Sequence, residues 1–408
     1  MSQKTHKALS FEDAVAHLLA AAVPVAETEM LSTLDAASRV LAVTQHSSID
    51  VPPHDNSAMD GYAVRVVDVT AHGCTLPVSQ RIAAGTVGTQ LAPGTAARIF
   101  TGAPIPAGTD AVVMQEKCVA EGDRVTINHQ PKAGDNIRRR GEDVATGSDV
   151  LAAGIRLSPQ ALGLAASVGI ATLPVFRKLR VAIFSTGDEL MMPGEPLRPG
   201  AIYNSNRFVL RGLLQGMDCG LVDLGIVPDK LTKTREALRR AAQDADLILT
   251  SGGVSVGEED HVKAAVQAEG ELNLWKIAIK PGKPLAFGHI ANGNGTTPFI
   301  GLPGNPVASF VTFLMLVRPF LRKRQGVAKQ IARGITLTAD FEWKRPDARR
   351  EFIRARIGED GRVLLYPHQG SGVLTSTVWA DGLVDLAPGQ TVARGDAVHF
   401  LPFSELLN

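Results

Sequence analysis

The stretch LTSGGVSVGEEDHV, residues 249–262, sets the fold class, because an apolar run ends here in two glycines and is soon followed by three consecutive acids. Glycine suits turns with positive φ and places where the backbone closely approaches a ligand. A glycine turn that leads into a helix also presents free N–H groups, which bind phosphate and other oxyanions. Adjacent carboxylates repel one another unless water, a cation or a cationic side chain stabilises them. The stretch therefore predicts a buried strand that ends at a ligand site.

Strands and helices alternate on both sides of this stretch. Near-continuous apolar strands that alternate with helices are typical of a mostly parallel, doubly wound sheet that is covered on both faces. Asn305 and Pro306 are suited to the start of the last helix, as its N-cap and first-turn residues. The expected strands are 177–187, 219–229, 246–253, 272–282, 283–290 and 297–304, and the expected helices are 204–217, 230–245, 259–270 and 305–321.

A chain of 408 residues is too long for one ordinary core, so several domains are expected around this α/β unit. Short Val/Ile-rich runs separated by Gly/Pro-rich turns predict an inserted β-rich domain at 48–145. Helical patterns at 10–45 and 158–170 flank this insertion, which predicts a discontinuous helical linking domain made of 1–47 and 146–177. The α/β domain is then 178–326, and 327–408 is a small, β-barrel-like C-terminal domain.

Composition excludes several classes of partner. The 42 basic and 41 acidic residues nearly cancel, so no overall field favours nucleic acid or a membrane surface. The 3 cysteines lie far apart without a CxxC pair, which argues against a disulfide framework and a structural zinc site. No apolar run is long enough to span a bilayer, and Ser10 with Asp13 resembles a helix start more than a signal peptide. We expect a cytoplasmic protein.

Charged residues gather at the expected carboxyl ends of the strands, where doubly wound sheets bind ligands. Alternation places Lys276 and Lys280 on one face of a strand, where they suit a multiply charged anion, although edge strands also carry solvated lysines. Glu258 and Glu259 would begin the following helix, where acidic charge is favourable. Carboxylates beside an anion site predict Mg²⁺ that bridges them to phosphate oxygens. The acids at these ends are Asp188, Glu189, Asp229, Glu258, Glu259 and Asp260.

Two segments of the expected insertion leave alternatives open. PPHDNSAMDG, residues 52–61, places Asp55 and Asp60 around a polar stretch that a turn alone would also explain. RRRGEDV, residues 138–144, is either an exposed salt-bridged surface or a set of arginines that grips an anion.

Several segments, in this order, resemble the molybdopterin molybdenumtransferases of the MoeA and gephyrin E-domain type, and the resemblance covers nearly the whole chain. NSAMDGYA and SGGVSVGxxD in one chain are the most specific of them, whereas GLPGNP alone would not be. The segments are NSAMDGYAV (56–64), TGAPIPAGTDAVV (101–113), RRRGEDV (138–144), STGDEL (185–190), TSGGVSVGEEDHV (250–262), KPGKPLAFG (280–288), GLPGNPVASFVTF (301–313) and HQGSGVLTSTVWADGL (368–383).

The resemblance implies a Mg²⁺-assisted enzyme that inserts molybdate into adenylylated molybdopterin and releases AMP. It also implies a homodimer in which the β insertion of one subunit lies near the α/β site of the other. A molybdopterin adenylyltransferase would deliver the substrate and molybdoenzymes would receive the product. Catalytic roles are expected for Asp60, Asp143, Glu189, Asp229 and Asp260, metal binding for Glu189, Asp229 and Asp260, and substrate binding for Ser251, Gly252, Gly253, Ser255, Lys276, Lys280, Pro303, Gly304 and Asn305.

Two other functions remain open at this stage. A molybdopterin adenylyltransferase could share the TSGG strand end, but such proteins are typically one α/β domain and lack the NSAMDGYA segment. A non-catalytic molybdopterin-binding scaffold is supported by analogy of fold alone, and it would not need acids at every strand end.

Overall fold

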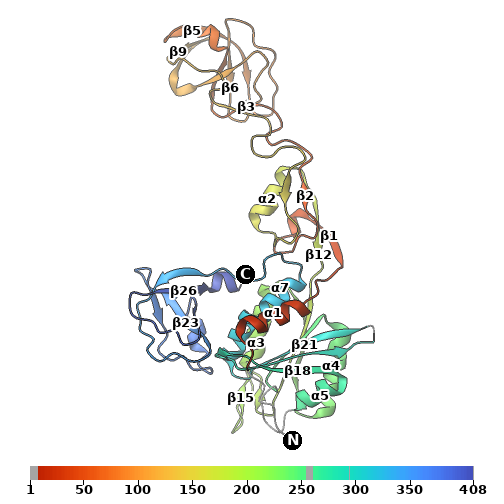
Figure 1. The fold of residues 1–408 in the computed structure, drawn as a ribbon. Coiled ribbons are helices and arrows are strands. Elements are labelled where there is room, and N and C mark those ends of the chain that lie inside the picture. Colours follow the sequence, from red (N-terminus) through yellow and green to blue (C-terminus); the bar gives the residue numbers. More distant parts are fainter. Residues whose placement is uncertain (1–7, 254–260, 294, 408) are drawn as a thin grey trace.

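The computed structural model describes residues 8–253, 261–293 and 295–407 and shows an elongated molecule (Figure 1). Its central unit is a six-stranded sheet with strand order β16-β13-β17-β21-β20-β18. Of its six strands only β20 runs in the opposite direction to the others, so the doubly wound, mostly parallel sheet is confirmed. The strands are β13 (Arg180–Thr186), β16 (Gly220–Val227), β17 (Leu247–Ser251), β18 (Gly270–Lys276), β20 (Pro284–Ala291) and β21 (Thr296–Leu302).

Helices cover both faces of this sheet because its strands are apolar on both sides. Val181 and Ile183 of β13 pack against one group of helices, and Ala182 and Phe184 pack against the other. Successive side chains of a strand point to opposite faces, so each strand contributes to two cores. The first group is α1 (Phe11–Ala21), α3 (Ser205–Gly216), α6 (Pro306–Thr312) and α7 (Arg318–Arg324); the second is α4 (Leu231–Asp244) and α5 (His261–Glu269).

The N-terminal region is less helical than the sequence pattern predicted. Helix α1 ends at Ala21, shortly before Pro24, and β1 (Thr28–Ser32) follows. The expectation of helix through 10–45 is therefore wrong beyond Ala21, because proline disfavours the helical conformation of the residue before it and has no N–H for a helical hydrogen bond. Strand β1 pairs antiparallel with β12 (Thr172–Phe176), and α2 (Pro159–Ser167) lies beside them. Helix α1 instead packs in the α/β core.

A separate β unit occupies the far end of the molecule (Figure 1). Its six-stranded sheet has the order β7-β4-β6-β5-β9-β8, and Tyr62, Val113 and Val125 lie in its own core. The chain enters this unit through β3 (Asn56–Ser57) and leaves it through β10 (Ile137–Arg138), and these two strands pair with each other. The other strands are β4 (Gly61–Val64), β5 (Cys74–Ile82), β6 (Ala96–Ile99), β7 (Ala111–Met114), β8 (Cys118–Glu121) and β9 (Arg124–Ile127).

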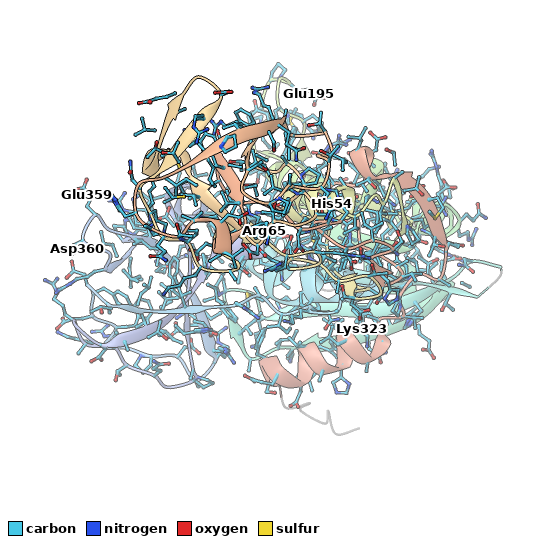
Figure 2. The ribbon with its side chains drawn as sticks, turned by 90° about the horizontal axis from the view of Figure 1, so that it is seen from above. His54, Arg65, Glu195, Lys323, Glu359 and Asp360 are labelled. Atoms are coloured by element: carbon cyan, nitrogen blue, oxygen red, sulfur yellow. The ribbon has the colours of Figure 1, made fainter. Side chains whose placement is uncertain are left out.

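The C-terminal unit is a second β structure, and it lies beside the central sheet (Figure 1). In the view from above, Glu359 and Asp360 mark its outer margin (Figure 2). Its sheet contains β23 (Arg350–Ile357), β25 (Gly382–Leu386), β26 (Ala397–Pro402) and β22 (Ile335–Thr338). The division of the chain at residues 47, 146, 177 and 326 stays a prediction.

The expected strand 272–282 is in fact two strands in different sheets. Strand β18 ends at Lys276, and β19 (Ile279–Lys280) pairs in parallel with β23 of the C-terminal unit. Between them the chain bonds to Leu9, whose N–H donates to the carbonyl of Lys276 and whose carbonyl accepts from Ala278. Residues 274–279 are apolar apart from Lys276, so the sequence pattern alone did not reveal the change of partner.

Candidate active site

The ends of the parallel strands meet at one edge of the central sheet. Thr186 of β13 lies opposite Val227 of β16, and Ser185 lies opposite Ser251 of β17. Ser251 is also opposite Leu302 of β21. The loops that follow these strands therefore start side by side, at the edge where doubly wound sheets bind ligands.

Two of these loops meet at glycines. The N–H of Gly252 donates to the carbonyl of Leu302 over 3.1 Å, and the Cα of Gly252 is 3.8 Å from where a Cβ on Gly304 would stand. Gly253 has φ +66°, and a Cβ there would lie 2.3 Å from the Val262 side chain. Only glycine fits at Gly253 without displacing the start of α5.

A cleft of about 620 Å³ opens beside these glycines, between the central sheet and the C-terminal unit. Its volume is in the range of small-molecule sites. Seven residues that the sequence predicted as site residues line it: Glu189, Gly252, Gly253, Lys280, Pro303, Gly304 and Asn305. A second cleft of about 570 Å³ shares Glu189, Gly252, Gly304 and Asn305 and adds Ser251, so the two clefts adjoin at the glycine contact.

The C-terminal unit supplies a wall of the larger cleft that sequence reasoning missed. Arg349 and the segment Gln369–Gly370–Ser371 line it. The carbonyl of Ser371 accepts from the N–H of Val307 in α6 over 3.0 Å, and the buried Arg354 donates to the carbonyl of Gly370 over 3.1 Å. The HQGSG segment, residues 368–372, was the available signal, because it places two glycines and three polar residues between the apolar residues at 363–365 and 373–374.

The two predicted lysines have different surroundings. Lys276 is exposed, and no ion pair to it is found within the part of the chain that the structure describes. The Lys280 ammonium lies 2.9 Å from a carboxylate oxygen of Glu351 and 3.5 Å from one of Asp347. Hydrogen bonds from Arg349, together with the charges of Arg349 and Lys280, hold the pKa of Asp347 well below its usual range. Lys280 thus lines the cleft while it forms ion pairs with Glu351 and Asp347.

The predicted metal ligands are only partly described. Glu189 is exposed and lines both clefts, and Asp229 is half-buried two residues after β16. Asp260 and Ser255 lie outside the described residues. Among those that are described, no cluster of three or more His, Cys, Asp or Glu side chains could hold a metal ion. Mg²⁺ is usually held by one or two carboxylates with water and substrate oxygens. Of the two described acids, Glu189 lines both clefts and Asp229 lines neither, so their assignment as metal ligands stays a prediction.

The remaining predicted acids line neither cleft: Asp60 directly precedes β4 of the far β unit, and Asp143 lies in the segment after β10, where the chain has left that unit. The Asp60 carboxylate accepts from the N–H and the hydroxyl of Thr101, both over 2.8 Å, and these bonds lower its pKa. Asp143 is exposed, and its N–H donates to Val51. One chain therefore does not bring Asp60 and Asp143 to the cleft.

The structure resolves the alternatives for RRRGEDV in favour of ion pairing for two of its arginines. The Arg139 guanidinium is 2.6 Å from the Asp55 carboxylate, and that of Arg140 is 2.5 Å from Asp50. Arg138 is exposed, and within the described ranges it has no such pair.

The fold is that of a MoeA-type multidomain protein built around a probable molybdopterin-binding domain. Residues 9–169 match the MoeA N-terminal region (domain I and II), residues 182–323 match a probable molybdopterin binding domain, and residues 336–403 match the MoeA C-terminal region (domain IV). The chain belongs to the molybdopterin molybdenumtransferase family.

Its relatives and solved structures agree with this assignment. The molybdopterin molybdenumtransferase of Haemophilus influenzae is 43% identical over 93% of this chain and 95% of its own length. Molybdopterin molybdenumtransferase 2 of Mycobacterium tuberculosis is 40% identical over 83% of this chain and 85% of its own. A crystal structure of the molybdopterin biosynthesis MoeA protein from Pyrococcus horikoshii superposes with TM-score 0.83 at 28% identity, covering 97% of this chain and 100% of that one. No helix within the described ranges is long and apolar enough to cross a membrane.

Proposed function

We propose that this chain inserts molybdenum from molybdate into adenylylated molybdopterin and releases AMP. The observation that carries the proposal is the larger cleft, in which close-approach glycines stand beside Lys280, Lys283 and Arg349. Backbone N–H groups and cationic side chains in one concave site suit a substrate that carries phosphates and an incoming oxyanion. The adenylyltransferase and scaffold alternatives are not favoured, because the family match extends over all units of the chain.

The proposed site residues have three roles: oxyanion binding, contact with the substrate and metal binding. Lys280, Lys283 and Arg349 are placed to bind the oxyanion and to reduce its repulsion from the phosphates of the pterin. The substrate can approach the backbone at the glycines Gly252, Gly253 and Gly304. Further proposed contacts with the substrate are Ser251, Ser255, Lys276, Pro303 and Asn305. Glu189, Asp229 and Asp260 would hold Mg²⁺. When bound, the ion would supply positive charge at the phosphoanhydride oxygens, which favours departure of AMP.

A homodimer would complete the site, with Asp60 and Asp143 supplied by a second copy. We further propose a cytoplasmic protein that receives adenylylated molybdopterin from an adenylyltransferase and passes the cofactor to molybdoenzymes. The distance between the far β unit and the cleft supports the dimer, because these acids do not reach the cleft of their own chain (Figure 1).

The test is AMP release from adenylylated molybdopterin, with molybdate and Mg²⁺ each present or omitted. Release should require both additions and should fall strongly in Asp60→Ala, Lys280→Gln and Asp260→Ala, whereas the exposed Glu195→Gln is the matched control. Release that ignores molybdate, or that survives all three substitutions, would contradict the proposal.

Mixing two inactive variants tests the shared site directly. If Asp60 serves the partner's cleft, unfolding and refolding Asp60→Ala together with Lys280→Gln creates mixed dimers with one intact site. About a quarter of wild-type activity should then return, because half of the dimers are mixed and each has one of two sites. No recovery, in a sample shown to contain mixed dimers, would place Asp60 in its own chain's site.

A further inference from the structure

Asp347 forms ion pairs with two cationic side chains that line the larger cleft. Its carboxylate accepts two bonds from the Arg349 guanidinium, over 2.9 and 2.8 Å, and one from the Arg349 N–H over 3.0 Å. The same carboxylate lies 3.5 Å from the Lys280 ammonium. Lys280 and Arg349 line the cleft. Two of its cations therefore share one internal anion.

The neighbouring Glu351 plays a different part, because it is tied into the fold. Its side chain is only 4% exposed and accepts from the Trp343 indole over 2.9 Å and from the Asp347 N–H over 3.0 Å. It also lies directly opposite Lys280 in the β19–β23 pair. The Asp347 side chain is 22% exposed, and the side-chain contacts found for it within the described residues are those to Lys280 and Arg349.

We propose that Asp347 is an affinity-determining residue, a built-in carboxylate that competes with the oxyanion for Lys280 and Arg349. The inference rests on the proposed function, which assigns these cations to an oxyanion. A carboxylate that engages an arginine through two parallel bonds occupies the donors that an oxyanion would use. Binding of the oxyanion must then weaken the contacts to Asp347 or tolerate repulsion from it, and either effect lowers affinity.

The inference predicts a gain of binding when a charge is removed. Asp347→Asn keeps the shape and an oxygen that can accept from the Arg349 N–H, but it removes the negative charge. We expect the dissociation constant for molybdate to fall by roughly three- to fivefold, the range that partly exposed ion pairs support. A role of Asp347 in structure alone would weaken binding or leave it unchanged, so the direction of the change separates the two roles.

The experiment is calorimetric titration of the intact protein with sodium molybdate at low ionic strength. Glu342→Gln is the matched control, because Glu342 pairs with Lys344 over 2.7 Å in the same unit and neither residue lines the cleft. The control should bind molybdate as the wild type does. If Asp347→Asn does not fold, as judged by circular dichroism, Asp347→Ser replaces it, since its hydroxyl can also accept from Arg349.

Each outcome decides the inference. Tighter binding in the Asp347 variant alone supports it, and so does binding that appears only in that variant. Unchanged or weaker binding by a folded variant overturns it, as does equal tightening in Glu342→Gln, or the absence of molybdate binding in every protein. Wild-type binding of molybdate without AMP release would refute the proposed reaction and leave the role of Asp347 standing on its own titration.

Discussion

The loop that carries Lys280 and Lys283 depends on Gly282, and Gly282→Ala tests how tightly the loop is fixed. Gly282 has φ +103°, and a Cβ there would stand 2.4 Å from the Thr312 hydroxyl oxygen in α6. Thr312 is 1% exposed, and its hydroxyl has no hydrogen-bond partner among the described residues. The alanine methyl group would therefore meet an atom that is itself held in place by packing.

Two costs should add in Gly282→Ala. Placing a side chain at positive φ costs about 1–2 kcal/mol, and forcing a methyl group into a packed core costs about 1–3 kcal/mol. The expected loss in the free energy of unfolding is therefore about 2–5 kcal/mol. Thr312→Ala removes the opposing oxygen and should return at least about 1 kcal/mol in the double variant, whereas Thr312→Ser keeps that oxygen and should return nothing.

Urea unfolding followed by tryptophan fluorescence measures these differences, since Trp275 lies in β18 near the start of the loop. The three single variants and the two double variants are compared with the wild type, and molybdate titration reports whether the loop still presents its lysines. Rescue by Thr312→Ser as strong as by Thr312→Ala would refute the argument, because the contact would then not involve the hydroxyl. Strict additivity of Gly282→Ala and Thr312→Ala would refute it as well.

Three further predictions concern charges and thiols. A hydrogen bond from the Thr146 N–H is the main cause that lowers the Asp50 pKa to about 2. The Asp50 carboxylate therefore stabilises the fold above about pH 4, and this contribution disappears as the pH falls to about 2. Asp50→Asn should remove the loss of stability between these two pH values from an acid unfolding curve. Arg350→Met leaves the buried Asp385 carboxylate without its bidentate partner and should cost about 3–5 kcal/mol, and adding Asp385→Asn should recover much of this in urea unfolding. Burial raises the pKa of the Cys219 thiol to about 12, so mass spectrometry should find it unmodified by iodoacetamide at pH 8 until the chain unfolds.

Much of the central fold could be predicted from the sequence because two signals, an apolar run and a glycine directly after it, indicate its strands. Runs such as 180–186 and 247–251 are apolar on both faces, and a glycine follows each of them. A strand that feeds both cores, as Val181 and Ala182 do, cannot be mistaken for an amphipathic helix. The N-terminal prediction failed because the alanine-rich helical pattern near residues 14–22 was extended past Pro24, which the chain cannot pass in helical form.

The candidate site divides in the same way. Gly252, Glu189 and Gly304 could be predicted to meet because parallel strands share one edge, so local strand assignments suffice to place their ends together. Arg349 and Ser371 could not be predicted, because no local pattern says which face of a β unit will cover a cleft in another domain. Only long-range contacts, such as the bond from Val307 to Ser371, decide that.

The charge of the site shows why residue types alone do not determine its affinity for anions. Lysines at strand ends predict a cationic cleft, and Lys280 does line it. After β18, however, the chain leaves the central sheet and β19 pairs with β23. That register sets Glu351 opposite Lys280, and the Asp347 carboxylate lies 3.5 Å from the Lys280 ammonium. The β19–β23 pairing that joins the C-terminal unit to the segment carrying Lys280 thus also reduces the positive charge in the cleft. Affinity for an oxyanion is then set by how far the anion outcompetes these carboxylates, which is the quantity that Asp347→Asn changes.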